Sequence, residues 1–227
     1  MSSARDQILG SIRTALGREA LAGEDAAKLH EKLARPTRNL VPDRTDLDHD
    51  GQVALFKDKL LAAACSVSEV SAMDEVPNAL SEWLGRENLA ARVIQSPALA
   101  GDLDWSATPT LEVKTGMSDG TDETSITPIF AGVAETGTLM LQSDASLPTS
   151  LNFLPENHVV IVKESQIVGP LEDAWARLRT ARAADGDEVM PRTVNLITGP
   201  SRTGDIEQKI QMGAHGPRRL HVILVRD

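Results

Sequence analysis

The chain has 227 residues, 41% of them apolar, which is enough for one α/β domain with a hydrophobic core, or for one domain with a small appendage. Its 33 acidic and 23 basic residues give a net charge of −10, and only 3% of its residues are aromatic. These values argue against a nucleic-acid binder, which needs a basic surface and often rings for base stacking, and against binding to an anionic membrane.

Cys65 is the single cysteine, so no intrachain disulfide can form, and a cysteine-ligated iron–sulfur cluster would lack ligands. We expect a buried structural thiol here, at the end of an apolar helix pattern. No Gly-x-Gly-x-x-Gly turn follows a strand, so no flavin or nicotinamide cofactor is predicted. Neither a signal peptide nor a run as long as a membrane span is visible, which predicts a cytoplasmic protein without membrane insertion.

The first 50 residues read as a helical extension followed by a linker. Residues 2–16 place Ile8, Ile12 and Leu16 four apart, with serines before them, and this predicts an amphipathic helix. Residues 24–35 predict a second helix. Residues 36–50 are polar and contain two prolines, so they are expected to be extended.

From residue 51 to residue 227, helical and strand patterns alternate. Helices are expected at 53–64, 74–84 and 170–182, and the predicted strands are 66–70, 91–95, 110–114, 139–142, 157–162, 194–197 and 220–225. This alternation is typical of an α/β domain with a mostly parallel sheet covered by helices. His158 is expected at the surface or at a sheet edge.

The segment Ala131–Thr138 reads A-G-V-A-E-T-G-T and lies between two apolar stretches. A carboxylate in such a turn is costly unless it is paired or functional, so Glu135 is a candidate nucleophile or general base. The alternative is a structural glutamate that pairs with an arginine or accepts backbone N–H bonds. Thr136, Gly137 and Thr138 could cradle an anion or form a hairpin turn, and these two readings are compatible.

A second segment, N-L-I-T-G-P-S-R-T-G-D-I-E, begins at Asn195 and combines a strand, a hydroxyl-rich turn and a predicted helix start at Asp205. Free backbone N–H groups at a helix N-terminus attract anions, and the guanidinium of Arg202 fits a carboxylate or phosphate. The plainer alternative is a connection capped by Thr203 or Asp205. The predicted ligand-binding residues here are Thr198, Gly199, Ser201, Arg202, Thr203 and Asp205.

A third turn, Gly213–Pro217, holds His215, which could bind a ligand or act as an acid–base group, although most loop histidines are simply solvated. Arg218 and Arg219 could add positive charge. Asp46, Asp48, His49 and Asp50 lack the spacing of known metal sites, so we predict no metal.

Together, A-G-V-A-E-T-G-T, T-G-P-S-R-T-G-D-I-E and the closing G-A-H-G-P-R-R-L-H-V-I-L resemble the LUD-domain family, over about residues 50–227. The resemblance implies a fold akin to ribose-phosphate isomerases and CoA transferases. It also implies a role in bacterial oxidation of L-lactate to pyruvate, beside iron–sulfur partner proteins and with a small anionic ligand.

CoA transferases of related fold use a glutamate for thioester chemistry, but A-E-T-G-T departs from their usual glutamate motif. We expect the site at the carboxyl ends of the sheet strands, lined by residues 132–138, 198–205 and 213–218.

Two other functions remain open. The chain could be an independent enzyme acting on a phosphate, CoA or folate-like ligand, or a non-catalytic assembly subunit for the iron–sulfur proteins.

Overall fold

The computed structural model describes residues 3–19, 21–34, 36–184, 190–204 and 211–227. The chain divides into two compact units, Met1–Leu40 and Val41–Asp227. The predicted helix start at Asp205 lies outside the described residues.

The first unit contains helices α1 (Ala4–Leu16) and α2 (Gly23–Ala34). Ser3 caps α1: its hydroxyl accepts the Asp6 N–H, and the Asp6 carboxylate accepts the Ser3 N–H in return. Within the described residues of this unit nothing covers the apolar face of α1, since Ile8, Ile12 and Leu16 are 61%, 48% and 61% exposed. An exposed apolar stripe of this kind is typical of a helix that contacts a partner.

The second unit is built on a six-stranded sheet in which all neighbouring strands are parallel, in the order β1-β12-β7-β4-β2-β3. The strands are β1 (Ser66–Val70), β2 (Arg92–Gln95), β3 (Glu112–Thr115), β4 (Thr124–Pro128), β7 (Asn157–Lys163) and β12 (Arg219–Val225). The last strand in sequence therefore lies inside the sheet, between β1 and β7.

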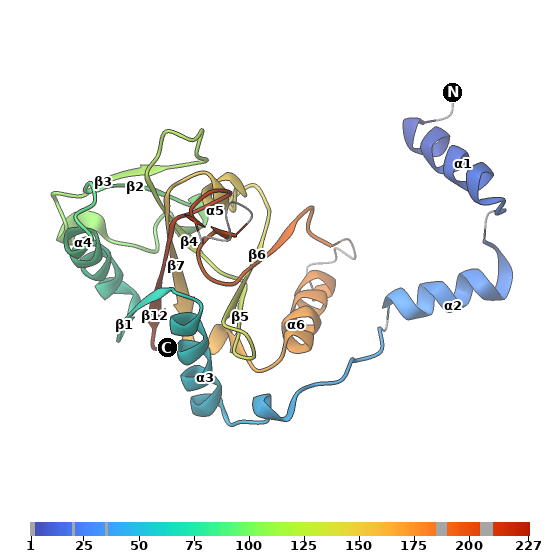
Figure 1. Ribbon diagram of the computed structural model, residues 1–227, viewed down its shortest axis with the longest axis horizontal. Helices are drawn as coiled ribbons and strands as arrows, with labels where there is room; N and C mark the ends of the chain where they lie inside the picture. Colours follow the sequence, from blue (N-terminus) through green and yellow to red (C-terminus); the bar gives the residue numbers. More distant parts are fainter. Residues whose placement is uncertain (1–2, 20, 35, 185–189, 205–210) are drawn as a thin grey trace. The chain divides into compact units, whose positions relative to one another are not determined.

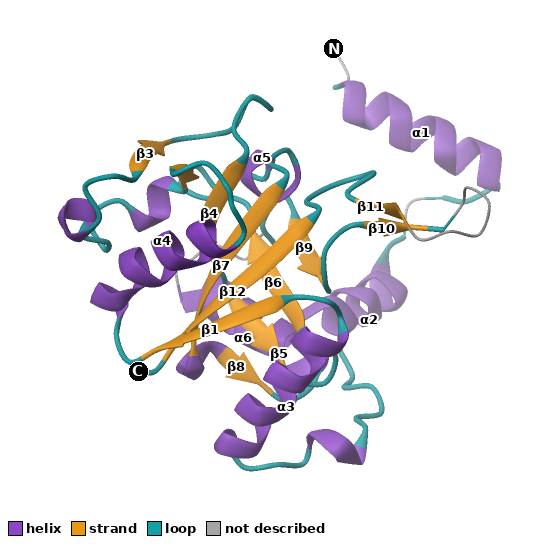
Figure 2. Cartoon of the chain, turned by 60° about the vertical axis from the view of Figure 1, so that its left-hand side comes forward, coloured by secondary structure: helices purple, strands orange, loops and turns teal. Residues whose placement is uncertain are grey.

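A second sheet has four strands in the order β8-β5-β6-β9 and is largely antiparallel. Its members are β5 (Ala131–Val133), β6 (Thr138–Gln142), β8 (Ile167–Val168) and β9 (Val194–Ile197). Beyond the end of β9, the two-residue strands β10 (Arg202–Thr203) and β11 (Gln211–Met212) pair with each other (Figure 2).

The layers of this unit follow one another from α4 to α6 (Figure 1), and three apolar cores lie between them. Between α4 (Val76–Arg86) and the parallel sheet, Trp83, Leu80 and Ile223 are buried. On the other face of that sheet, a second core joins α3 (His49–Ala62) to β6 through Phe56, Leu60 and Leu139. A third core packs α6 (Leu171–Ala184) on the outer face of the four-stranded sheet.

The remaining helical segments are short. They are α5 (Ser150–Phe153) and the 3-10 turns Asp43–Thr45, Met73–Glu75, Pro97–Leu99, Trp105–Ala107 and Glu164–Gln166. None of the described helices is both long and apolar enough to cross a membrane.

The predicted α/β fold with a mostly parallel, helix-covered sheet is confirmed. Two local predictions are wrong. His158 is not at the surface but fully buried in β7, because this strand is the third of six in its sheet and is covered on both faces. Residues 202–203 form a short strand rather than part of a turn, because they pair with 211–212.

We propose that residues 1–40 form a separable extension, because they make up a compact unit of their own. A chain beginning at Val41 should therefore keep a cooperative thermal transition within a few degrees of the full-length protein, measured by circular dichroism at 222 nm. Loss of that cooperative transition would mean that the extension is part of the folding core.

The two buried histidines, His158 and His221, predict acid sensitivity. Burial lowers the pKa of each to about 3, with nearby Arg86 adding to the effect at His221. Because the folded-state pKa lies below the unfolded value of about 6.5, the stabilisation is complete above pH 6.5 and is lost as the pH falls towards 3. Each histidine should lower the unfolding free energy by roughly 1 kcal/mol for each unit that the pH falls within that window.

Urea unfolding at pH 7 and at pH 5 measures this effect. His158→Gln, which removes one of the two groups, should flatten the dependence of unfolding free energy on pH. His30→Gln provides the control, because it replaces a histidine by glutamine at an exposed position. Equal slopes for His158→Gln and the wild type would contradict the assignment.

Candidate functional site

The predicted loops 135–138 and 198–199 lie side by side. The turn 134–137 joins β5 to β6, and Thr198 follows β9, which pairs antiparallel with β6. The start of β6 and the end of β9 therefore meet, so the loop residues sit at the carboxyl ends of β5, β8 and β9 in the four-stranded sheet.

A chain of three hydroxyls links the two loops. Thr136 Oγ1 lies 2.7 Å from Thr138 Oγ1, which lies 2.6 Å from Thr198 Oγ1. Thr138 is buried, whereas Thr136 and Thr198 are exposed. Three hydroxyls carry three protons and the two bonds between them use two, so one proton is left to offer to a ligand.

Two glycines hold these loops against the last turns of α3. A Cβ added at Gly137, where φ is +66°, would lie 2.8 Å from the Lys59 carbonyl carbon and the Leu60 nitrogen. A Cβ at Gly199, where φ is +77°, would clash with the Ala63 oxygen. Both the backbone conformation and the close approach therefore require glycine.

Glu135 is engaged by the protein. Its carboxylate accepts a 3.1 Å bond from Arg44 Nη2 and a longer, 3.4 Å bond from the Leu171 N–H at the start of α6. Its side chain is 14% exposed and that of Arg44 is 54% exposed. These contacts are of the kind that a structural glutamate makes, and Arg44 is a partner that the sequence did not reveal.

The 201–203 segment meets the turn that precedes β12. Ser201 donates its N–H to the Pro217 oxygen and accepts the Gly213 N–H, at 2.9 and 2.8 Å. The His215 N–H donates to Ser201 Oγ at 3.2 Å, while His215 itself is exposed. Ser201 therefore holds the two turns together.

The position of the 213–218 turn corrects one expectation. This turn leads into β12, and the Arg218 N–H donates to the Glu156 oxygen just before β7. It therefore lies at the amino ends of these parallel strands, not at their carboxyl ends. The loops that were expected to line the site therefore lie at two kinds of strand end. Residues 132–138 and 198–203 lie at carboxyl ends in the four-stranded sheet, and residues 213–218 lie at the amino ends of β7 and β12 in the six-stranded sheet.

The three candidate arginines differ in their partners. Arg218 pairs with Glu156 at 3.8 Å and Arg219 with Glu87 at 3.5 Å. Arg202 is exposed and forms no ion pair with any acid in the described parts of the chain. Its positive charge is therefore the one of the three most open to a ligand.

Cys65 is buried next to the site, as predicted. Burial raises the pKa of its thiol to about 11, although the Gly199 N–H and Arg202 act in the opposite direction. At neutral pH the thiol is protonated and therefore a poor nucleophile.

A further, partly buried pair was missed by the sequence analysis. Ser66 Oγ lies 2.8 Å from His221 Nδ1, and the His221 ring stacks on Trp83 with centroids 4.6 Å apart. No sequence signal identifies this pair, because the parallel pairing of β1 with β12 brings it together. Within the described residues, no group of three or more His, Cys, Asp or Glu side chains could hold a metal ion.

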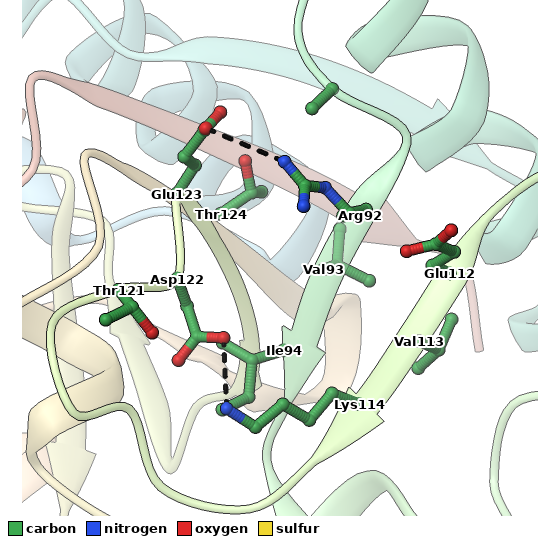
Figure 3. Close-up of a pocket in the computed structure, with 11 residues that line it drawn as sticks. Arg92, Val93, Ile94, Glu112, Val113, Lys114, Thr121, Asp122, Glu123 and Thr124 are labelled. Carbon is green, nitrogen blue, oxygen red and sulfur yellow. Dashed lines mark hydrogen bonds and ion pairs between the residues drawn. The ribbon is translucent and has the colours of Figure 1, made fainter.

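A cavity of about 530 Å³ lies elsewhere, over β2, β3 and the segment leading into β4 (Figure 3). Its charges pair across it, with Lys114 3.3 Å from Asp122 and Arg92 4.0 Å from Glu123. It contains none of the predicted site residues, and its opposing charges leave little net attraction for an anion.

Comparison with known proteins identifies the family. The protein-family model described as the LUD domain matches residues 120–225, which contain all three sequence motifs. Lactate utilization protein C of Deinococcus radiodurans is 31% identical over 175 residues, covering 75% of this chain and 77% of that protein. The chain belongs to the LUD-domain family.

Other family members are similar over shorter spans. Lactate utilization protein C of Bacillus licheniformis is 39% identical and that of Macrococcus caseolyticus 40% identical, each over 95 residues and 42% of this chain. The matches cover only 39% and 40% of those two proteins. The crystal structure of a DUF162 family protein from Deinococcus radiodurans has a TM-score of 0.61 at 27% identity, covering 79% of this chain and 99% of that one.

Glu135 provides a test of structural against catalytic roles. If it orders the loop through Arg44, Glu135→Gln should lower the unfolding free energy by about 1 kcal/mol, because the pair is partly exposed. Arg44→Gln should have a similar effect, and the double variant should lose less than the sum. Urea unfolding of the four proteins measures this coupling, and a general base would instead show unchanged stability with additive effects.

Proposed function

We propose that the chain acts in bacterial L-lactate utilisation, beside iron–sulfur partner proteins, and binds a small anion between the 136–138 and 198–203 segments. The pathway part of this proposal is supported by the relatives named lactate utilization protein C. The observation that supports the site most directly is the hydrogen bond between Thr138 and Thr198, which joins two of the three family motifs.

The chemistry of the site fits an anion. It offers one free hydroxyl proton from the Thr136–Thr138–Thr198 chain and an open guanidinium at Arg202. In a unit whose charge is strongly negative, local cations and donors of this kind are required to hold a negative ligand. The Cys65 thiol is neutral and the Glu135 carboxylate is paired with Arg44. Neither group therefore repels a negative ligand strongly.

Isothermal titration with lactate, pyruvate, inorganic phosphate and CoA tests the site. Arg202→Ala should weaken binding about ten- to hundredfold, because a charge-assisted hydrogen bond contributes about 1.5–3 kcal/mol. Arg92→Ala is the matched control, since Arg92 belongs to the cavity over β2 and β3. Loss of binding in Arg92→Ala but not in Arg202→Ala would move the ligand to that cavity.

The pathway part has its own test. Deleting the gene should abolish growth on L-lactate as sole carbon source without affecting growth on pyruvate. Normal growth of the deletion strain on L-lactate would exclude an essential role in that pathway.

An assembly role is a second candidate, favoured by the exposed apolar face of α1. In that case, residues 1–40 should be needed for co-purification with the iron–sulfur proteins, and Arg202→Ala should leave lactate-dependent growth unchanged.

A further inference from the structure

The anion site has a third wall, formed by the C-terminal half of α3. Gly132 lies against Phe56, Gly137 against Lys59 and Leu60, and Gly199 against Ala63. These α3 residues are spaced by one helical turn each and so share one face of the helix. Both site loops are therefore fixed to the same short stretch of α3.

Lys59 is the charged residue among the α3 residues that face these glycines. Its Cβ would lie 2.8 Å from a Cβ on Gly137, so its stem starts directly beside the residue between Thr136 and Thr138. Lys59 is partly exposed and forms no ion pair with any acid that the structure describes, whereas Lys57 pairs with Glu69 at 2.6 Å. Its flexible stem allows the ammonium to reach the hydroxyl chain.

Arg202 approaches the same end of α3 from the other loop. It lies three residues after Gly199, which packs against Ala63, and its charge acts to lower the pKa of the Cys65 thiol. Lys59 and Ala63 are four residues apart, a rise of about 6 Å along the helix. Two cations that no described acid neutralises are therefore associated with the three hydroxyls, Lys59 beside Gly137 and Arg202 in the segment that follows Thr198.

We propose that Lys59 is a ligand-binding residue and that the site takes a dianionic phosphoryl group. The inference rests on the anion site proposed above. A phosphoryl group carries close to two negative charges near neutral pH and has three acceptor oxygens, so it can satisfy both cations and a threonine donor. A monocarboxylate has one charge and two oxygens, and would leave one cation unpaired.

The competing explanation is that Lys59 only stabilises the end of α3, where a cation interacts favourably with the helix dipole. The two explanations predict different measurements. A purely structural lysine changes the melting temperature without ligand, whereas a binding lysine changes the affinity for phosphate.

Titration of the full chain with inorganic phosphate at pH 8 and low ionic strength tests the proposal, with sodium L-lactate as the monoanionic comparison. Lys59→Gln should weaken phosphate binding about ten- to hundredfold, and Lys59→Arg should retain most of it. Lys57→Gln, on the same helix, should bind phosphate like the wild type. The wild type should bind phosphate at least about tenfold more tightly than lactate, because the second charge adds to the attraction.

Each other outcome has a definite meaning. If phosphate binds but Lys59→Gln and Lys57→Gln bind it equally well, the role of Lys59 is refuted while the anion site stands. If the wild type binds lactate as tightly as phosphate, the dianion assignment is refuted. If the wild type binds neither phosphate nor any other anion tested, the site itself is refuted, and this inference with it.

Discussion

The close approach of three glycines to one face of α3 is the constraint on which the candidate site depends. Gly132, Gly137 and Gly199 come from β5, the following turn and the loop after β9, and each would clash with α3 if it carried a side chain. The helix is itself fixed by Phe56 and Leu60 in the core beneath the parallel sheet. Through α3, the packing of that core therefore sets the distance between the two loops. A change in the packing of the core would shift the two loops relative to each other.

Periodicity and family motifs predicted most of the larger elements and singled out loops that the structure brings together, but they did not predict which edges of the sheets those loops occupy. The pattern of β12 shows a buried strand and says nothing of its neighbours. Its place between β1 and β7 puts the 213–218 turn at the amino ends of the sheet. The second sheet was missed because β8 has only two residues and β5 only three, too few to show an alternation.

The partners of the site residues were also beyond the sequence. Arg44 and Glu135 are 91 residues apart, and only the folded chain brings this arginine rather than another to the carboxylate. The burial of His158 was missed for a related reason. A single polar residue just before an apolar run looks like the exposed end of a strand. In the structure, the hydroxyl of Thr127, on the adjacent strand, lies 2.8 Å from its ring nitrogen, and this contact helps to make its burial tolerable.

The order of strands in the sheet has a consequence for biosynthesis. Among the described strands, β1 pairs with β12 alone, and the contact between Ser66 and His221 spans 155 residues. At about 5–20 residues per second, a ribosome takes roughly 8–30 s to add that length of chain. During this interval the backbone groups of β1 lack their native partner and can pair with those of other nascent chains. The cellular yield of this protein should therefore depend on chaperones that protect extended segments during translation.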